Sequence, residues 1–401
     1  MNLASLSAGY LRARPLQTAL SLILLALGVG TIVAALLAVD QLEGRMRRDA
    51  RGIDLVVGAK GSPMQLILAG IYHLDAPTGN IPLASLNLFS KNRLIKRVIP
   101  LALGDAFKSF RIVGAPPEYL ELYQAELRAG KLYEKPMEAV LGAEVAERTG
   151  LGVGARMVGA HGLSGDGAEH GESPYIAVGV LEKSGSVLDR LVLTSVESVW
   201  HVHEAAHEPK DEANRKALAE DREVTVALVQ YASPLAAASL PRAINSRSEL
   251  QAASPAYETA RLFRIIGAGV EALNAFAVVL ILAAGLSVFI ALYSALEERR
   301  YDLAVMRTLG ASPARLFGLL LLEGVVLAAL GTLAGIVLGH LFTSGLGLWL
   351  EAAQQPTVTG LAFVLEELWL ALAALGVGIL AALIPAWRAY RTDVSRTLAH
   401  G

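Results

Sequence analysis

Histidines gather in one part of the chain, since five of the eight fall between positions 161 and 207. If residues 202–208 form a helix, His203 and His207 share one face at i and i+4, the spacing by which a helix offers two imidazoles to one zinc ion. Imidazole with carboxylate suits zinc, copper or nickel better than magnesium or calcium. The pattern predicts a zinc site, and the competing interpretation is a solvated polar face at the start of a charged insertion. The candidate ligands are His161, His170, His201, His203 and His207.

Other kinds of chemistry find no support in the sequence. Zero cysteines exclude disulfides, cysteine-ligated metals and thiol catalysis. There is no Gly-x-x-x-x-Gly-Lys-Ser/Thr loop to cradle phosphates and no Gly-x-Ser-x-Gly elbow, so any ATP hydrolysis must come from another polypeptide. A formal net charge of -2 gives no basic surplus for binding nucleic acid. We therefore expect a non-catalytic chain that binds no polynucleotide.

Membrane helices are expected to form part of the chain. The chain is 54% hydrophobic with a mean hydropathy of +0.47, yet 18% of its residues are charged. Four stretches lack Asp, Glu, Lys and Arg for about the ~20 residues that cross a ~30 Å hydrocarbon core. They are residues 15–39, 272–296, 324–350 and 368–387, one followed by three. The first is longer than the ~7 to 15 residues of a cleaved signal, which predicts an uncleaved anchor.

Arginines in the connecting loops predict the orientation, because short loops rich in Lys and Arg favour the cytoplasm. The loop between the second and third spans holds Arg299, Arg300, Arg307 and Arg315, whereas the next loop holds none. This places both termini inside and residues 40–264 in the periplasm, across a bacterial inner membrane. A basic group just after the first span argues the other way, but long loops translocate largely regardless of charge.

Three parts follow from this arrangement. Residues 1–39 hold a short interfacial helix, or alternatively a disordered tail, and the first span; residues 40–264 form the outer domain; residues 265–401 hold the other three spans. In the outer domain, short runs rich in β-branched residues alternate with helical segments, which predicts an α+β fold. The expected strands are 54–58, 97–103, 110–114, 139–142, 176–181, 190–194 and 224–230.

Residues 298–309 form a charged segment between the second and third spans. Gly310 suits the left-handed position after a helix, and Ser312 with Pro313 suits the start of the next one. The breaks predict a short rigid helix at the cytoplasmic surface. The alternative is an ordinary connector that is basic because it lies inside.

The third span carries two further features. Gly331, Gly335 and Gly339 recur at every fourth position, which permits close approach of another helix, in the same chain or in a second copy. The alternative is that the glycines are merely tolerated there. Glu323 lies roughly 12 Å along the helix from Arg315, at 1.5 Å per residue. An acid at that depth is either paired and functional or reaches back to the interface.

Several of these segments resemble a known family. Residues 298–312 together with 321–324 are similar to the signature of FtsX-like permeases, and residues 384–389 resemble the ending of that family. In the outer domain, residues 139–142 and 151–154 resemble a MacB-type periplasmic core. Residues 63–82 match no exporter pattern, so the resemblance leaves the substrate open. It implies four membrane helices, one plus three, with an α+β extracytoplasmic domain.

The resemblance also implies a function. The chain would be the permease subunit of a type VII, MacB/LolCE-like ABC transporter, which transmits ATP-driven motion to its periplasmic domain to export or extract a substrate. The implied partners are a cytosolic ABC ATPase holding ATP and magnesium, a second permease copy, a periplasmic protein and the lipid membrane. The alternatives are an FtsX-like mechanical regulator of a periplasmic partner, a zinc-linked periplasmic handling system, and a membrane sensor. The implied ATPase-coupling residues are Glu298, Arg299, Arg300, Asp302, Met306, Arg307, Leu309 and Gly310.

Overall fold

The computed structural model describes residues 9, 12–90, 92–162, 173–204, 222–352 and 357–391. The chain divides into two compact units. One combines Met1–Leu42 with Ile265–Gly401, and we call it the membrane unit; the other, Glu43–Arg264, is the outer unit. The expected charged insertion comprises residues 204–223, and most of it falls outside the described residues.

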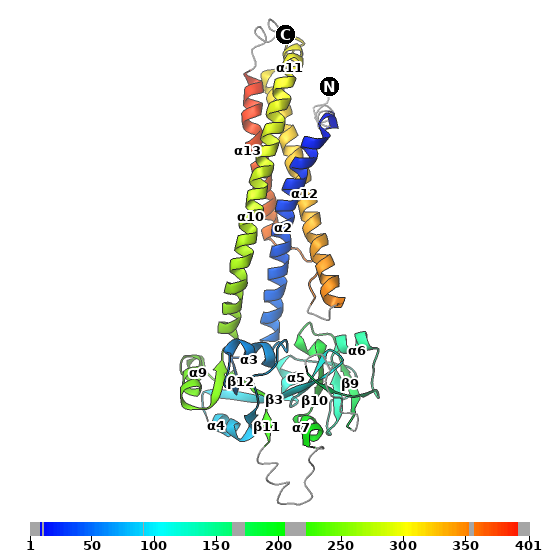
Figure 1. Ribbon diagram of the computed structural model, residues 1–401, viewed down its shortest axis with the longest axis vertical. Helices are drawn as coiled ribbons and strands as arrows, with labels where there is room; N and C mark the ends of the chain where they lie inside the picture. The colour runs from blue at the N-terminus through cyan, green and yellow to red at the C-terminus, as the bar shows by residue number, and fades with distance from the viewer. Residues whose placement is uncertain are drawn as a thin grey trace, which may run out of the picture. The chain divides into compact units, whose positions relative to one another are not determined.

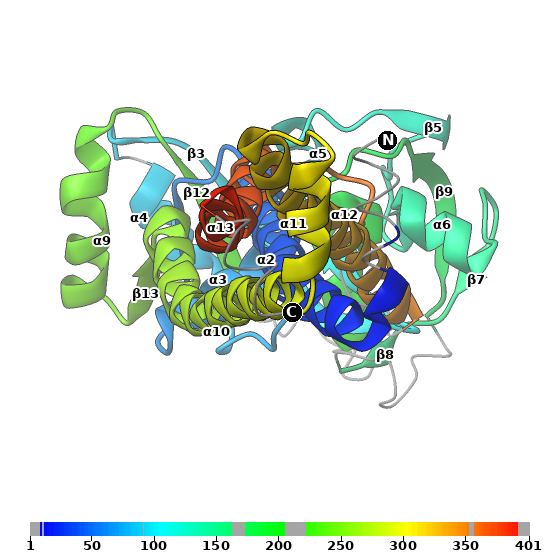
Figure 2. The same cartoon turned by 90° about the horizontal axis from the view of Figure 1, so that it is seen from above.

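The membrane unit is a bundle of long helices (Figure 1). Among the described residues, four helices are long and apolar enough to cross a membrane, by length and composition, as the four charge-free stretches predict. Helix α11, of nine residues, joins two of them at one end of the bundle (Figure 2). The helices are α2 (Pro15–Asp49), α10 (Pro255–Glu298), α11 (Arg300–Thr308), α12 (Pro313–Ala352) and α13 (Glu366–Tyr390).

Small residues bring the bundle helices close together. On α2, every fourth residue from Leu25 to Leu37 is buried, namely Leu25, Val29, Val33 and Leu37. This ridge packs on α12. Between α12 and α13, a Cβ added at Gly324 would lie 2.5 Å from Ala382 Cβ. Helix packing in a membrane depends on such close contacts, because lipid is as apolar as leucine and offers no hydrophobic gain.

The outer unit is α+β and is built on a mixed sheet of 11 strands, as the alternating pattern predicts. The strand order is β13-β1-β12-β3-β4-β10-β6-β9-β5, with β7 paired to β9 and β8 to β3. Strands β2 and β11 form a separate two-stranded sheet. Pairs β10–β4 and β6–β9 are parallel. The strands are β1 (Leu55–Ala59), β2 (Ile81–Pro82), β3 (Ile95–Phe107), β4 (Phe110–Gly114), β5 (Leu127–Gly130), β6 (Glu138–Leu141), β7 (Arg156–Met157), β8 (Ala160–His161), β9 (Tyr175–Leu181), β10 (Leu191–Thr194), β11 (Glu223–Val224), β12 (Val226–Tyr231) and β13 (Leu250–Ala253).

Strand β3 connects two lobes of this sheet. Residues Ile95 to Leu101 pair with β12, and residues Ala102 to Phe107 pair with β4, with a register shift between Leu103 and Ala106. The two lobes have separate buried cores, and the core of one lobe surrounds Leu55 and Val229. The helices of the outer unit are α3 (Pro63–Gly70), η1 (Leu83–Leu86), α4 (Asn87–Ser90), α5 (Glu118–Leu122), α6 (Ala143–Thr149), η2 (Val187–Arg190), α7 (Val196–Glu204) and α9 (Leu235–Arg247).

Candidate functional site

Helix α11 has one face buried and one face exposed. Leu303 and Ala304 are buried, and Leu303 packs in a cluster with residues of α10, α12 and α13. Tyr301 is 55% exposed and Leu309, the residue that ends the helix, is 82% exposed. The helix is therefore fixed to the bundle on one side and presents an apolar and charged surface on the other.

The expected helix over residues 298–309 is shorter in the structure. Glu298 is the last residue of α10, and Arg299 adopts φ -103° and ψ 12°, which interrupts the helical path before α11 begins. Gly310 follows with φ +94°, a left-handed conformation that side chains rarely adopt. These two breaks fix the direction of α11 relative to α10 and α12.

Charged residues from three segments meet at the base of α11. The Nη1 atom of Arg299 lies 3.6 Å from Oε1 of Glu323, and both side chains are largely buried. Arg14, just before α2, forms an ion pair with Glu298. The structure thus brings two separately predicted residues, Arg299 and Glu323, into one cluster. Arg14 was not predicted to belong to this site. Its position directly before the first apolar stretch could have indicated it.

The remaining predicted coupling residues divide between the two faces of α11. Asp302 is exposed, and Arg300 pairs with Glu297 at 3.2 Å. Arg307 is half-buried, and Met306 packs against the buried cluster of the bundle. Met306 therefore supports α11 from inside, and the exposed face is carried by Tyr301 and Leu309.

The glycine row of α12 lies against α2 of the same chain. A Cβ added at Gly331 would lie 2.8 Å from Leu25 Cδ2, and one at Gly335 would lie 2.6 Å from Val29 Cβ. One at Gly339 would lie 2.7 Å from Val33 Cβ. These distances leave no room for a side chain, so the row is the surface on which α2 packs.

The candidate zinc ligands are only partly described. His161 lies on β8, with Nδ1 3.1 Å from Oδ1 of the buried Asp105. His201 is exposed on α7, and His203 belongs to the last turn of the same helix. His170 and His207 lie outside the described residues. Within the described part of the chain, no three His, Asp or Glu residues are grouped to hold a metal ion.

In the outer unit, Tyr72 links the two long helices that continue from the membrane unit. Its hydroxyl lies 2.9 Å from Oγ1 of Thr259 on α10 and donates to the carbonyl of Met46 on α2, at 3.4 Å. The next residue, His73, is buried and has φ 55°. Burial lowers the pKa of His73 to about 3, so its imidazole stays neutral at physiological pH.

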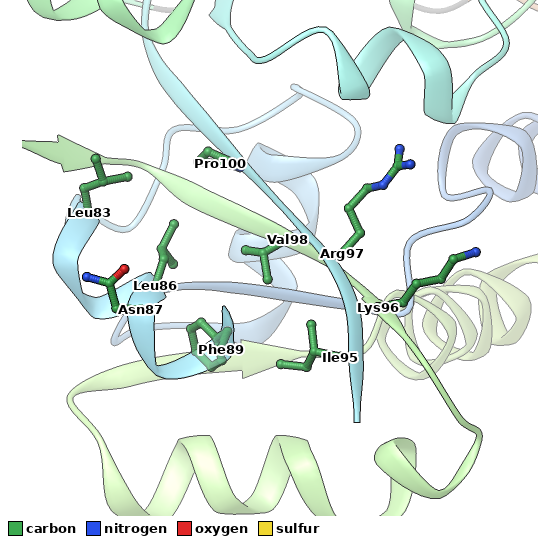
Figure 3. Close-up of a pocket in the computed structure, with 9 residues that line it drawn as sticks. All are labelled: Leu83, Leu86, Asn87, Phe89, Ile95, Lys96, Arg97, Val98 and Pro100. Carbon is green, nitrogen blue, oxygen red and sulfur yellow. The ribbon is translucent and has the colours of Figure 1, made fainter. Parts of the chain in front are cut away.

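A small hollow opens beside β3 (Figure 3). Its volume is about 380 Å³. Leu83, Leu86 and Phe89 line one side, while Lys96 and Arg97 extend away from them in the close-up. The guanidinium of Arg97 forms an ion pair with the carboxylate of Glu121, at 3.2 Å. The complete lining is Leu83, Leu86, Asn87, Phe89, Ile95, Lys96, Arg97, Val98 and Pro100. The hollow is therefore mainly apolar.

Comparison with known proteins matches both units. Residues 274–394 match the family model of the FtsX-like permease C-terminal region, and residues 18–247 match that of the MacB-like periplasmic core domain. LolC of Xylella fastidiosa, described as a lipoprotein-releasing system transmembrane protein, is 28% identical over 117 residues. That alignment covers 26% of this chain and 28% of LolC, so it spans well under a third of either protein.

Two solved structures are similar to about half of the chain. The periplasmic region of MacB from Actinobacillus actinomycetemcomitans has a TM-score of 0.33 at 13% identity, covering 54% of this chain and 97% of that one. The extracellular domain of the noncanonic ABC-type transporter YknZ from Gram-positive bacteria has a TM-score of 0.29 at 12% identity, covering 50% and 98%.

Proposed function

The chain belongs to the family of FtsX-like permeases with a MacB-like periplasmic core domain, and from this we propose that it couples a separate cytosolic ATPase to movement of its outer unit. Permeases of this family are non-catalytic membrane subunits of ABC transporters that work with ATPase subunits. ATP and magnesium then belong to the partner. The permease contributes the surface on which the partner docks and the helices that move.

The amphipathic construction of α11 is the observation that carries the proposal. Its buried face, with Leu303 and Ala304, ties it to the bundle, so a force applied to the exposed face reaches α10 and α12. Helices α2 and α10 each continue without interruption from the membrane unit into the outer unit. These continuous helices are the route by which movement at α11 would reach the outer unit. The work would then be done outside the membrane, on export or extraction of a substrate.

The arginines of the loop around α11 support the proposed orientation. Short loops rich in arginine favour the cytoplasm. We therefore propose that α11 and both termini lie inside and that residues 40–264 lie in the periplasm of a cell with an inner membrane. The partners we propose are the ATPase, a second permease copy and a periplasmic protein. Zinc binding by the histidine-rich segment also stays a prediction, because two of its five ligands lie outside the described residues.

The experiment compares two Leu→Asp variants. Leu309→Asp places a charge on the exposed end of α11, whereas Leu235→Asp makes the same change at an exposed position of α9, where Leu235 is 74% exposed. Each variant is expressed with the ABC ATPase that copurifies with the wild-type permease. We expect Leu309→Asp to reduce copurified ATPase at least tenfold, which corresponds to about 1.4 kcal/mol of binding free energy. Leu235→Asp should copurify it normally, and equal recovery from both variants would contradict docking at α11.

A further inference from the structure

A loop at the other end of the bundle is fastened to three helices. Residues 357–365 lie between α12 and α13, at the end opposite α11. Two glycines let this loop approach α12 closely. A Cβ at Gly347 would clash with the carbonyl of Val358, and one at Gly360 would clash with the carbonyl of His340. The backbone of the loop therefore lies directly on α12.

His340 of α12 makes two polar contacts there. Its Nδ1 atom lies 2.5 Å from the carbonyl oxygen of Gly360 in the loop. Its Nε2 atom lies 2.9 Å from Oε2 of Glu367, in the first turn of α13. The other oxygen of Glu367 accepts a hydrogen bond of 3.1 Å from the backbone N–H of Val364. The side chain of His340 is 13% exposed and that of Glu367 only 6%.

For both contacts to be hydrogen bonds, the pair needs one more proton than a neutral imidazole and an ionised carboxylate carry. A neutral imidazole carries a single N–H, and its other nitrogen is an acceptor. Here the carbonyl of Gly360 and the carboxylate of Glu367 are both acceptors, so a neutral ring facing an ionised acid would leave two lone pairs opposed. Either the imidazole is doubly protonated, or the acid is protonated and donates to Nε2. In both cases the pair holds one additional proton.

We infer that His340 and Glu367 form a proton-binding site that fastens the 357–365 loop to α12 and α13, and that loss of this proton weakens this attachment by one hydrogen bond. With the proton present, His340 donates to Gly360, and a hydrogen bond joins it to Glu367. When the proton leaves to water, one of these hydrogen bonds is replaced by repulsion between lone pairs. Proton binding therefore stabilises the attached loop at low pH. As the pH rises and the proton leaves, one of the two hydrogen bonds of His340 is lost.

A second contact to the loop does not depend on pH. Gln41 of α2 donates from Nε2 to the carbonyl of Thr359 and accepts from its N–H, both at 2.8 Å. The amide does not titrate, so this contact keeps the loop attached to α2 when the proton leaves. The other group that faces the imidazole is the ring of Phe363, 4.5 Å away, and it is uncharged. Among the described residues that interact with His340, Glu367 is the one charged group.

The absence of cysteine allows a direct test on the full chain. A spin label on Leu361→Cys, at a position 86% exposed, reports the mobility of the loop in detergent or nanodiscs. We expect an immobilised spectrum at pH 5 that gains a mobile component by pH 9, with a single-proton midpoint. A label on Val153→Cys, at a position 53% exposed in the outer unit, should give a spectrum that does not change with pH.

Glu367→Gln separates proton binding from a merely structural contact. The glutamine amide donates to Nε2 of a neutral imidazole, and its carbonyl still accepts from Val364, so it imitates the protonated acid. The loop of this variant should remain immobilised from pH 5 to pH 9. The inference is overturned if the wild-type spectrum is the same throughout this range, or if Glu367→Gln titrates as wild type does. Neither result depends on an ATPase, so the proposed function is tested separately.

Discussion

Glu323 is a buried carboxylate in an otherwise apolar part of α12, and its position next to Arg299 explains how it can be there. Isolated charges are costly to bury, and a buried pair is stable only while both partners are present. Arg299 leaves the helical path between α10 and α11 and reaches Glu323 at 3.6 Å. The sequence identified each of these residues but not their pairing, because they are separated along the chain by α11 and the start of α12.

Breaking this pair should destabilise the membrane unit. We expect Glu323→Leu to lower the free energy of unfolding by roughly 3–5 kcal/mol, because Arg299 would remain buried without its acid. The double variant Glu323→Leu with Arg299→Met removes both charges and should recover most of this loss. Thermal unfolding in detergent measures both variants. If the double variant is as unstable as the single one, Glu323 does not stabilise the membrane unit through its pairing with Arg299.

His73 should make the outer unit sensitive to acid. Its pKa is about 3 in the folded chain because of burial, whereas an exposed histidine has a pKa of ~6.5. The unfolded chain therefore binds a proton that the folded chain does not. Stability from this residue is fully present above pH ~6.5 and falls as the pH drops toward 3, by up to about 1.4 kcal/mol per pH unit.

His73→Asn should reduce this acid sensitivity between pH 6.5 and 5, because asparagine does not titrate and tolerates the positive φ of 55°. Hydrogen exchange of strand amides in the full chain, corrected for intrinsic rates, measures the change. His201→Asn, at an exposed position of α7, is the matched control and should behave as wild type. If His73→Asn loses protection in acid as steeply as wild type, the neutral buried imidazole is not the cause.

Among the elements, regular patterns were predicted well and irregular ones were not. The runs of β-branched residues gave strands close to their observed positions, such as β9 and β10. Strand β3 was predicted only to residue 103, because Gly104 interrupts the apolar pattern where the register shifts toward β4. Strand β5 was missed because all four of its residues are exposed and carry no alternation. The contact of His340 with Glu367 had no sequence signal, since 27 positions separate them.

The packing of α2 on α12 gives a prediction for the glycine row. Gly335→Leu would force the two helices apart, because a Cβ at this position already lies 2.6 Å from Val29 Cβ. We expect a loss of about 1–3 kcal/mol in unfolding free energy, as for overpacking of other cores. Gly345→Leu on the same helix is the control, since a Cβ there has no neighbour within 4 Å. Equal melting temperatures for the two variants in detergent would contradict this interface.

At the scale of the whole molecule, the sequence predicted the fold class because both units follow strong periodic signals. Charge-free stretches mark the membrane helices, and alternation of strands and helices marks the outer α+β fold. The predicted outer domain began at residue 40, while the compact unit begins at Glu43, inside the continuous helix α2. A helix that passes through a boundary gives no compositional sign of where the compact units divide.

Crosslinking shows whether α11 is the part of the permease that contacts the ATPase. Two cysteines are introduced singly into the cysteine-free chain, Leu309→Cys at the end of α11 and Leu361→Cys at the opposite end of the bundle, at positions 82% and 86% exposed. Each permease is assembled with the ABC ATPase that copurifies with the wild-type chain and is treated with a short bifunctional crosslinker. If α11 is the docking site, Leu309→Cys should give a permease–ATPase product and Leu361→Cys should give none. A product from Leu361→Cys alone, or equal yields from both, would rule out docking at α11.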